Sequence, residues 1–372
     1  MVKTVVVVGA SFAGLAVSHR LLKYTLPKQP DLRVVLVSKS THFYWNLAAI
    51  RAVVPGLLTK DQLYHAIEPG FASYPKDSFE LVVATATGLD TSSKTAVVKS
   101  ADGLERKLKY DYLVLATGAR AASEGVPWKP QDDHQATVDL LDKTAERVKV
   151  ANHIVIAGAG ATGCETSAEI KHQYKDKEVV LLSADPEVLS GDVLAGNMEH
   201  EITKLGVQVK KGSRVQGSKV LEDGRTEVAL ADGTKIVTDL YLPTMGLVPN
   251  TDFIDKKHLN DKSYVEVDEC YRVKGAEDVW AAGDIVSKPR AGFMITDKQA
   301  AGVAKNVELA MQGKPQVPVK LLPVDILFCA AGRDRGAGRI SSFKVPSIMA
   351  WAAKGRTLGL PWAPKYVDGT QW

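Results

Sequence analysis

The sequence contains no long apolar run. None of its hydrophobic stretches approaches the roughly 20 residues that a membrane-spanning helix requires. The chain starts Met1-Val2-Lys3 and continues directly into the strand-like run Val5 to Val8, which leaves no room for a secretory or transit peptide. Val2 in place of glycine excludes N-myristoylation. We therefore expect a cytoplasmic protein whose contact with an intracellular membrane, if there is one, is peripheral.

Cysteine is scarce, and its spacing is wide. Cys164, Cys270 and Cys329 form no CxxC motif. A disulfide framework, a structural zinc site and the dithiol of a disulfide reductase each need closely spaced cysteines, so we expect none of these and no metal site. The three residues are interpreted as small buried apolar side chains in a reducing compartment.

The charges of the chain are nearly balanced. It has 47 Lys and Arg against 43 Asp and Glu, a formal net charge of +4, and the basic residues are scattered. This pattern does not favour a nucleic-acid-binding surface. At 372 residues and 45% apolar composition, the chain is typical of a globular protein that is too long for one compact core, so two or three domains are expected.

The stretch VVVVGASFAGLAV, Val5 to Val17, is typical of a strand, a turn and the start of a helix. In a dinucleotide-binding GxGxxG turn, the first glycine makes the tight turn and the last lets the helix pack on the strand. The middle glycine lets the backbone approach a pyrophosphate at the helix N-terminus. Ser11 stands at that middle position, where its hydroxyl is able to donate to a phosphate oxygen. Alone this turn is weak evidence, because a plain strand–turn–helix unit has the same pattern.

A second stretch, IVIAGAGATGCETSAEI from Ile154 to Ile170, contains all three glycines. Each of the two stretches is followed by another β-branched apolar run, Leu32 to Val37 and Glu178 to Leu182. A strand, a helix and a second strand in this order form a unit with parallel strands. The repeat therefore predicts two nucleotide-binding domains of the α/β class.

The residue after the second strand of such a unit is usually acidic, because a carboxylate binds the hydroxyls of the adenosine ribose. Here Ser38, followed by Lys39, stands at that position in the first unit. Ser183 stands there in the second unit, and Asp185 follows two residues later. Without an acidic side chain at the end of this strand, the site does not repel NADPH. Without an arginine beside that position, the site does not select NADPH either. We expect the second site to accept either nicotinamide.

Each unit is closed by a buried strand that ends in a glycine turn. The first closing strand is Tyr110 to Arg120, and the second is Asp239 to Asn250. A third strand and turn, Asp278 to Ile285, precedes a helix that is predicted from Thr296 to Met311. A Pro-rich strip then leads to short strands around the glycine-rich GRDRGAGR and a tail that contains tryptophans.

The order of these motifs resembles that of the pyridine nucleotide-disulfide oxidoreductases, flavoproteins with two dinucleotide-binding domains. The matching motifs are GASFAG, ATG, GAGATG with its glutamates, a glycine turn before Pro-Asn, and AAGD. The resemblance implies that the first turn binds FAD and the second binds NADH or NADPH. It also implies that Asp284 accepts a hydrogen bond from the ribityl chain of FAD. The helix near Thr296 then points its positive end at the flavin. Asp284 as a simple turn or N-cap residue is the alternative.

The resemblance also divides the chain and assigns cofactor contacts. The expected architecture is two Rossmann-like domains plus a small C-terminal α+β region. The FAD-binding domain comprises residues 1–122 and 247–317, the NAD(P)H-binding domain residues 123–246, and the C-terminal region residues 318–372. The expected contacts with FAD are Gly9, Ser11, Phe12, Ala13, Gly14, Ser38, Lys39, Arg51, Ala116, Thr117, Gly118, Gly283 and Asp284. Those with the nicotinamide cofactor are Gly158, Gly160, Thr162, Gly163, Glu165, Ser183 and Gly246.

Three stretches resemble the apoptosis-inducing-factor-like branch that includes the ferroptosis suppressor proteins. They are FYWNLAAIR from Phe43 to Arg51, TGCE from Thr162 to Glu165 with Glu169 four residues on, and GRDRGAGRI from Gly332 to Ile340. This branch implies an NAD(P)H:quinone reductase, in which hydride passes from NAD(P)H to flavin N5 and two electrons then pass to a quinone or another small acceptor. The missing dithiol removes thiol substrates such as glutathione or thioredoxin.

In that branch a basic residue after the second strand pairs with the glutamate that follows the last glycine of the second turn. Carried over, this pair is Arg51 and Glu165. Glu165 then orients the amide edge of the nicotinamide, and Arg51 stabilises charge on the reduced flavin near N5. The plainer alternatives are a first-turn helix acid for Glu165 and a surface helix residue for Arg51. Lys320 is a third candidate for contact with flavin or quinone, although its neighbours Leu321-Leu322-Pro323 do not match the branch.

The tail from Lys344 to Trp372 places Trp351, Trp362 and Trp372 among basic residues. This pattern suits a membrane interface, which a lipid-soluble quinone would require. It equally suits packing on the chain itself or on a second subunit in a homodimer. Two other functions stay open at this point, an FAD-dependent oxidoreductase of one specific small metabolite and a redox-sensing protein like some apoptosis-inducing-factor relatives.

Overall fold

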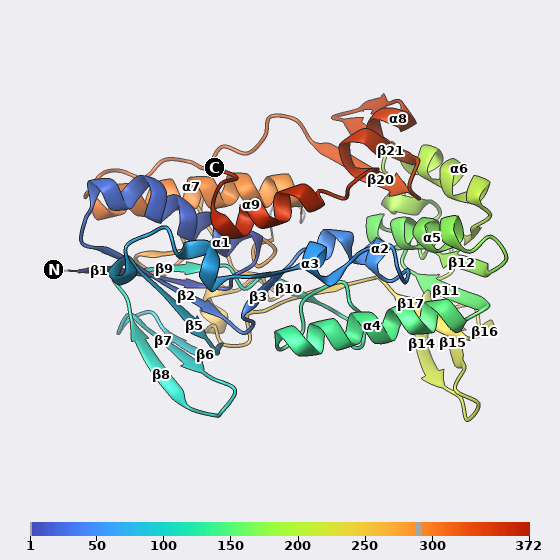
Figure 1. Ribbon diagram of the computed structural model, residues 1–372, viewed down its shortest axis with the longest axis horizontal. Coiled ribbons are helices and arrows are strands. Elements are labelled where there is room, and N and C mark those ends of the chain that lie inside the picture. The colour runs from blue at the N-terminus through green and yellow to red at the C-terminus, as the bar shows by residue number, and fades with distance from the viewer. Residues whose placement is uncertain (1, 288–291) are drawn as a thin grey trace.

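The structure, a computed structural model, describes residues 2–287 and 292–372. Its two largest sheets lie one after the other along the long axis of the molecule, and both consist of parallel strands (Figure 1). Helices pack beside each sheet, and the C-terminal strands lie above the helices of the second one (Figure 1). The prediction of an α/β fold with two Rossmann-like units is confirmed. The residue boundaries of the four predicted parts stay a prediction.

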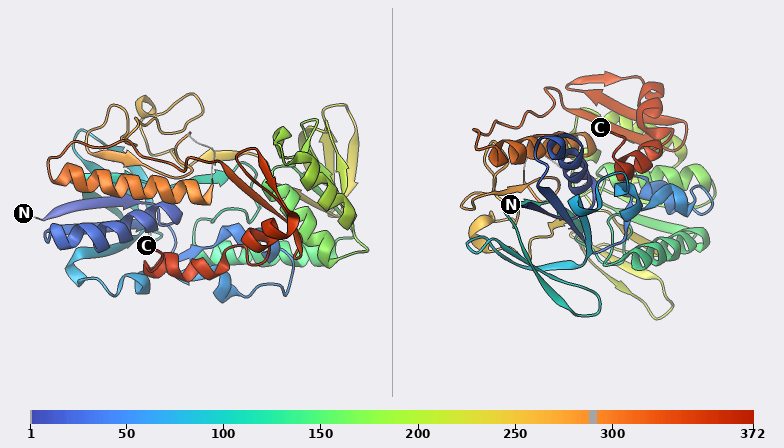
Figure 2. Two further views of the ribbon diagram at one scale, coloured as in Figure 1. Left: turned by 90° about the horizontal axis from the view of Figure 1, so that it is seen from above. Right: turned by 60° about the vertical axis from the view of Figure 1, so that its left-hand side comes forward.

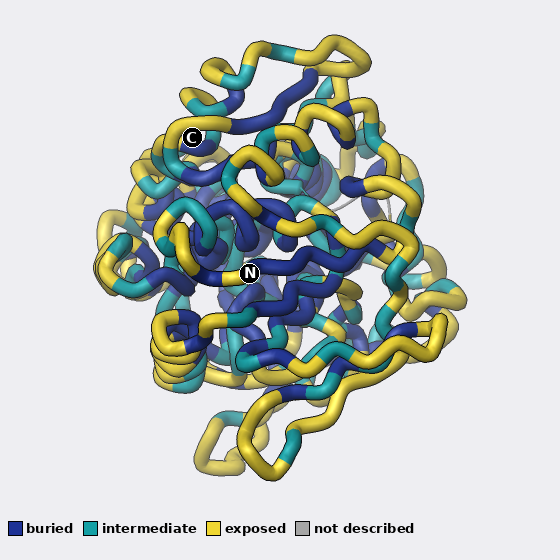
Figure 3. The backbone as a smooth tube through the Cα atoms, turned by 90° about the vertical axis from the view of Figure 1, so that its right-hand side faces the viewer, coloured by how far each residue is buried: buried dark blue, intermediate teal, exposed yellow. Residues whose placement is uncertain are grey.

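The first sheet has the strand order β19-β9-β1-β2-β5. Its strands are Lys3–Val8 (β1), Leu32–Ser38 (β2), Phe79–Val83 (β5), Tyr112–Leu115 (β9) and Val279–Ala281 (β19). In the central strand β1, Val5, Val6 and Val7 are fully buried, because both faces of this parallel sheet are covered. Figure 3 shows the strand that follows the N-terminus in dark blue at the centre of the molecule. All five strands therefore end at the same edge, where the glycine turns follow.

Helices α1 (Phe12–Arg20) and α7 (Phe293–Met311) pack against each other beside the first sheet (Figure 2). The helix predicted from Thr296 to Met311 is α7, and it starts three residues earlier than predicted, at Phe293. Gly292 is its N-cap in an extended conformation, and Thr296 N donates to Gly292 O at 2.9 Å. The ring of Phe293 packs against that of Phe12 at 5.6 Å, which holds this first turn on the core.

The second sheet has the order β13-β12-β11-β17. Its strands are His153–Ala157 (β11), Glu178–Leu182 (β12), Gln208–Lys210 (β13) and Leu240–Pro243 (β17). Its helices are His134–Val150 (α4), Ala161–Gln173 (α5) and Ala195–Leu205 (α6). Asp133 caps α4 by accepting a hydrogen bond from Ala136 N at 2.7 Å. The second unit thus repeats the first, with α5 following the intact glycine turn.

Shorter elements complete these two units. Two antiparallel sheets are Thr85–Asp90, Thr95–Lys99 and Glu105–Lys109 (β6 to β8), and Val215–Val220, Thr226–Leu230 and Lys235–Thr238 (β14 to β16). Two strand pairs are His42–Tyr44 with Tyr64–Ala66 (β3, β4) and Ala119–Ala121 with Leu247–Pro249 (β10, β18). Two short helices are Ala49–Ala52 (α2) and Lys60–Leu63 (α3). The β10–β18 pair joins the two closing turns.

The C-terminal part forms a small sheet and then returns to the first unit. Its elements are Ile326–Ala331 (β20), Arg335–Ile340 (β21), Phe343–Val345 (β22), Ser347–Ala350 (α8), the π-helical turn Trp351–Gly355 (η8) and Ala363–Asp368 (α9). Strand β20 packs on α5, and α9 packs on α1 (Figure 1). The end of the chain therefore contacts both units.

The tryptophans of the tail make contacts within the chain. Trp351 Nε1 donates to the carbonyl of Arg333, and Trp372 Nε1 donates to Asp297 at 2.8 Å. Trp362 stacks on Phe293 with ring centroids 5.5 Å apart but is 43% exposed. Of the roles that the sequence left open for the tail, Trp351 and Trp372 thus have packing on the chain itself. Within residues 2–287 and 292–372, no helix combines the length and apolar character needed to cross a membrane.

Candidate active site

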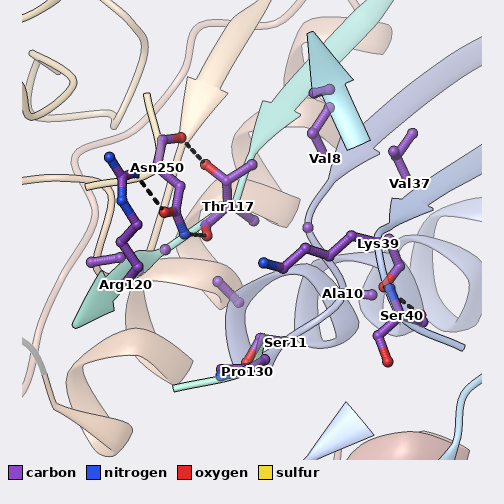
Figure 4. Close-up of a pocket in the computed structure, with 18 of the residues that line it drawn as sticks. Val8, Ala10, Ser11, Val37, Lys39, Ser40, Thr117, Arg120, Pro130 and Asn250 are labelled. Carbon is purple, nitrogen blue, oxygen red and sulfur yellow. Dashed lines mark hydrogen bonds between the residues drawn. The ribbon is translucent and has the colours of Figure 1, made fainter. Parts of the chain in front are cut away.

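A cavity of about 540 Å³ lies where the strands of the first sheet end. Its walls come from the turn after β1, the segment after β2, the end of β9 and the turn after β19. Figure 4 shows Ser11, Lys39 and Thr117, from three of these segments, around one space. All residues expected to contact FAD line this cavity except Gly14 and Arg51. Its volume is in the range of ligand-binding pockets.

The first glycine turn fits only small residues at two of its positions. Gly9 has φ +107°, and a Cβ there would lie 2.3 Å from the backbone oxygen of Ala116. A Cβ on Gly14 would lie 1.7 Å from the oxygen of Gly9. Ser11 lines the cavity and is the N-cap of α1, but its side chain caps no N–H of the helix. The turn is thus tight where the pattern demands glycine, and the Ser11 hydroxyl is left for a ligand.

The segment after β2 presents Ser38 and Lys39 to the same cavity. Ser38 is 7% exposed, and its hydroxyl donates to Ser40 O at 2.6 Å and accepts from Ser40 N at 3.2 Å. Its hydrogen bonds therefore stabilise its own turn, and a ribose would have to compete for them. Lys39 Nζ is 3.3 Å from the exposed carboxylate of Asp132.

Asp284 closes the cavity on the side of β19. Lys129 Nζ donates to Asp284 Oδ2 at 2.6 Å, and both residues line the cavity. Gly283 has φ +86°, and its N–H donates to Gln299 Oε1 of α7 at 2.7 Å. The AAGD turn is therefore tied to the helix that the sequence placed behind it. Lys129 carried no signal in the sequence, because it lies in the connection between the two units.

The second glycine turn has the same tight geometry. Gly158 has φ +101°, and a Cβ on Gly163 would lie 1.9 Å from the oxygen of Gly158. Gly160 is the N-cap of α5 and has open space around its Cβ position. Thr162 is partly exposed in the first turn of α5. This turn presents the N-terminus of a 13-residue helix, a favourable place for a phosphate.

Two expected nicotinamide contacts have other bonding partners. Ser183 is 2% exposed, and its hydroxyl donates to Glu187 O at 3.1 Å. It is buried at the predicted position and its hydroxyl already has a partner, so a ribose would have to compete for it; contact of Ser183 with the cofactor stays a prediction. Gly246 has φ +79°, and its carbonyl accepts from Ala122 N at 3.2 Å. This glycine joins the two closing turns.

The predicted pairing of Arg51 with Glu165 is wrong. Arg51 Nη2 and Nε donate to Oε1 of Glu169, at 2.6 and 3.0 Å. Glu169 lies four residues further along α5, which is about one helical turn. The reason is packing, because α2 lies against α5 while η8 packs on β20 and brings Lys354 to Glu165. The plainer alternatives do not apply either. Arg51 is 5% exposed and so is not a surface residue, and Glu165 lies beyond the first turn of α5, which contains no acidic residue.

Lys354 is the residue that occupies the expected place of Arg51. Its Nζ donates to Glu165 Oε1 at 2.7 Å, and Ala330 N donates to the same oxygen at 2.7 Å. Burial lowers the pKa of Lys354, but the charge of Glu165 and the hydrogen bond to it outweigh that effect, so its pKa is raised. Lys320, the lysine proposed from the sequence, is exposed after α7 and is not among the residues that line the cavity.

Glu169 is the most deeply buried carboxylate of this junction. It is 0% exposed, and its Oε2 is buried without a hydrogen-bond partner among the described residues. Burial raises the pKa of Glu169, and the hydrogen bonds and charge of Arg51 oppose that rise. Arg51 also donates to the carbonyls of Gly355 at 2.7 Å and Arg356 at 3.3 Å. Arg51 thus ties the first unit to α5 and to the segment that carries Lys354.

Comparison with known proteins identifies the family. The pyridine nucleotide-disulphide oxidoreductase family matches residues 3–313 of the chain. The chain belongs to this family. The oxidoreductase ptaL of Pestalotiopsis fici is 35% identical over 378 residues, which cover 99% of both chains. Human ferroptosis suppressor protein 1 is 27% identical over 380 residues, covering 95% of this chain and 93% of its own. The resemblance to the ferroptosis suppressor branch is confirmed.

The fold of this pyridine nucleotide-disulphide oxidoreductase is shared with solved structures. The structure of NDH2 from Plasmodium falciparum in complex with NADH superposes with a TM-score of 0.78 at 12% identity, covering 100% of this chain and 99% of that one. At this identity the likeness concerns the fold alone. Family membership confirms the predicted cofactors, FAD as the resident group and NADH or NADPH as the co-substrate. The protein is a flavoprotein oxidoreductase.

Proposed function

We propose that the protein is an FAD-dependent NAD(P)H:quinone oxidoreductase. The observation that carries the proposal is the place of the cysteines. Cys164 and Cys329 are 0% exposed, Cys270 is 9% exposed, no disulfide joins these three residues, and none of them lines the cavity. Burial also raises the pKa of the Cys164 thiol well above its usual range, which disfavours the reactive thiolate. Reduced flavin therefore has no cysteine pair to reduce, and an external acceptor has to take its electrons.

The resemblance of GRDRGAGRI and the tail to the ferroptosis suppressor branch supports a quinone as that acceptor. FAD, when bound, supplies the N5 atom that accepts hydride and then passes two electrons on. We assign FAD to the 540 Å³ cavity, with its pyrophosphate at the Gly9 turn and its ribityl chain at Asp284. NAD(P)H is assigned to the Gly158 turn and the N-terminus of α5.

Glu165 is assigned to the amide edge of the nicotinamide. It follows the second glycine turn on α5, and the two bonds from Lys354 and Ala330 both reach its Oε1. These bonds fix the carboxylate and leave Oε2 to accept a hydrogen bond from a carboxamide. Arg51 is a positioning residue in this account, because its bonds to Glu169 and Gly355 hold α5 and the Lys354 segment together.

Acceptor comparison tests the proposed function. Purified holoprotein should oxidise NADH or NADPH rapidly with a short-chain ubiquinone analogue, and should show no turnover with oxidised glutathione. The proposal would be contradicted by reduction of the disulfide, or by a quinone rate no higher than the rate with oxygen alone.

A Glu165→Gln variant should slow flavin reduction by NAD(P)H. The amide cannot bind Lys354 as a carboxylate does, and it offers a weaker acceptor to the nicotinamide. Loss of a hydrogen bond to a charged group corresponds to a rate decrease of about 10- to 100-fold. Anaerobic stopped-flow bleaching of the flavin measures this step. Glu178→Gln, a half-exposed glutamate at the start of β12, is the matched control. Equal reduction rates in Glu165→Gln and wild type would remove Glu165 from its assigned role.

We further propose that the apolar tip around β22 and α8 contacts the membrane that holds the quinone. Phe343 is 78%, Ile348 54% and Met349 55% exposed, and the exposed Lys344 lies among them. Exposed apolar side chains beside a base suit an anionic lipid surface. A Phe343→Ser/Ile348→Ser variant should lose co-flotation with phosphatidylserine-containing vesicles, whereas Leu104→Ser, 69% exposed at a distant turn, should not. Wild-type protein that stays unbound to these vesicles would contradict the proposal.

A further inference from the structure

The connection between the two units crosses the first cavity at Lys129 and Pro130. Its backbone is fixed by neighbours on both sides. Trp128 Nε1 donates to Pro243 O at 2.8 Å, and Asn46 Nδ2 donates to Trp128 O at 2.8 Å. Gln131 Nε2 donates to the carbonyl of Lys129 at 2.9 Å. The Lys129 side chain therefore starts from a fixed point and reaches into the cavity.

Among the residues that the structure describes, three ion pairs lie in the cavity wall, and that of Lys129 is the most protected. Its Nζ is 2.6 Å from Asp284 Oδ2, and the two side chains are 21% and 18% exposed. The pair of Lys39 with Asp132 is 38% and 103% exposed, and that of Arg120 with Asp252 is 47% and 80% exposed. A charge is screened less by solvent in the more protected position.

The first glycine turn itself has no basic side chain, because it reads Gly-Ala-Ser-Phe-Ala-Gly. Lys129 and Pro130 line the same cavity as Gly9, Ala10 and Ser11 of this turn. On its other side Lys129 contacts Asp284, the residue assigned to the ribityl chain. A dinucleotide in this cavity places its pyrophosphate at the turn. Lys129 lines the cavity that contains both places, and its ammonium group offsets the negative charge that Asp284 would otherwise direct at that anion.

We propose that Lys129 is a cofactor-binding residue that binds the pyrophosphate of FAD and supplies the positive charge that the GASFAG turn lacks. An ammonium ion forms strong charge-assisted hydrogen bonds with phosphate oxygens. It remains close to Asp284, so that carboxylate and phosphate share one cation. This role also explains why a turn with Ser11 in place of the second glycine still suffices for a resident cofactor.

FAD binding to apoprotein tests this role without any turnover. In a fluorescence titration, Lys129→Met should bind FAD at least about tenfold more weakly than wild type. Lys129→Arg should restore most of the affinity, and the salt dependence of binding should fall in Lys129→Met. Lys94→Met is the matched control, because Lys94 forms an equally short 2.6 Å pair with Asp278 but does not line the cavity. The melting temperature of each apoprotein shows whether the variant is folded.

Fragments of the cofactor separate the pyrophosphate from the flavin ring. ADP, which carries the pyrophosphate, should compete with FAD more weakly in Lys129→Met, whereas the affinity for riboflavin should not change. Lys129→Met affinities within twofold of wild type, or a loss confined to riboflavin, would overturn the proposal. Absence of quinone reduction by the wild type would leave these affinities untouched, so the two proposals fail separately.

Discussion

A Gly9→Ala variant is expected to purify without flavin. Gly9 has φ +107°, a conformation that costs an alanine about 1–3 kcal/mol. The added Cβ would lie 2.3 Å from the backbone oxygen of Ala116, and relieving this overlap costs about 1–3 kcal/mol more. The strand end and the turn cannot both keep their positions, so the pyrophosphate site is distorted. The ratio of flavin to protein absorbance measures the loss directly.

Ser11→Gly is the matched control for this variant. It changes a residue of the same turn toward the usual glycine, and Ser11 makes no capping bond to α1. We expect Ser11→Gly to keep FAD, because Lys129 and Asp284 also face the cavity. A flavin-saturated Gly9→Ala protein would contradict the assignment of FAD to this turn. Heavy flavin loss in Ser11→Gly would instead make the Ser11 hydroxyl a principal phosphate ligand.

An Arg51→Met variant is expected to lose about 3–5 kcal/mol of unfolding free energy, because it leaves Glu169 buried without its cation. Arg51 and Glu169 are 5% and 0% exposed, so water cannot replace the lost partner. Chemical denaturation of the holoprotein measures the change. Arg225→Met, which removes an ion pair of 53% and 48% exposed side chains outside the cavity, should change stability little.

The loss of unfolding free energy in Arg51→Met should increase as the pH rises. Burial raises the pKa of Glu169 above its ordinary value, and Arg51 opposes that rise, so the variant has the higher folded-state pKa. A carboxyl whose pKa is raised by folding stabilises the folded state below its unfolded pKa, and this contribution is lost as pH rises through the folded pKa. The stability difference between wild type and variant should therefore widen from about pH 5 to pH 8. A difference that narrows over this range would show that Glu169 is not the group left unpaired.

The sequence predicts the parts of the fold that depend on local pattern. The two glycine turns, the β-branched strands and the strand that ends in Gly283-Asp284 follow from spacing alone, because tight turns and buried parallel strands restrict residue types. The start of α7 was less predictable. Phe293 belongs to the helix because its ring packs on Phe12, a residue distant in sequence.

The charged contacts of the candidate site could not be predicted from the sequence. Glu165 and Glu169 are one helical turn apart, and which of them meets Arg51 depends on how α2 and η8 pack on α5 and β20. Lys354 reaches Glu165 only because the C-terminal sheet lies on α5. Lys129 likewise acquires its partner Asp284 through the connection between the two units. Pairs that join separate elements are properties of packing, which a motif does not contain.

Anaerobic sequential mixing is the most direct test of the central claim that this flavoprotein passes electrons from NAD(P)H to a quinone. Holoprotein is first mixed with one equivalent of NADH or NADPH and then with a ubiquinone analogue, while the flavin absorbance is followed. We expect the nicotinamide to bleach the flavin and the quinone to restore its absorbance as fast as turnover requires. Bleached flavin that persists in the presence of the quinone would contradict this claim.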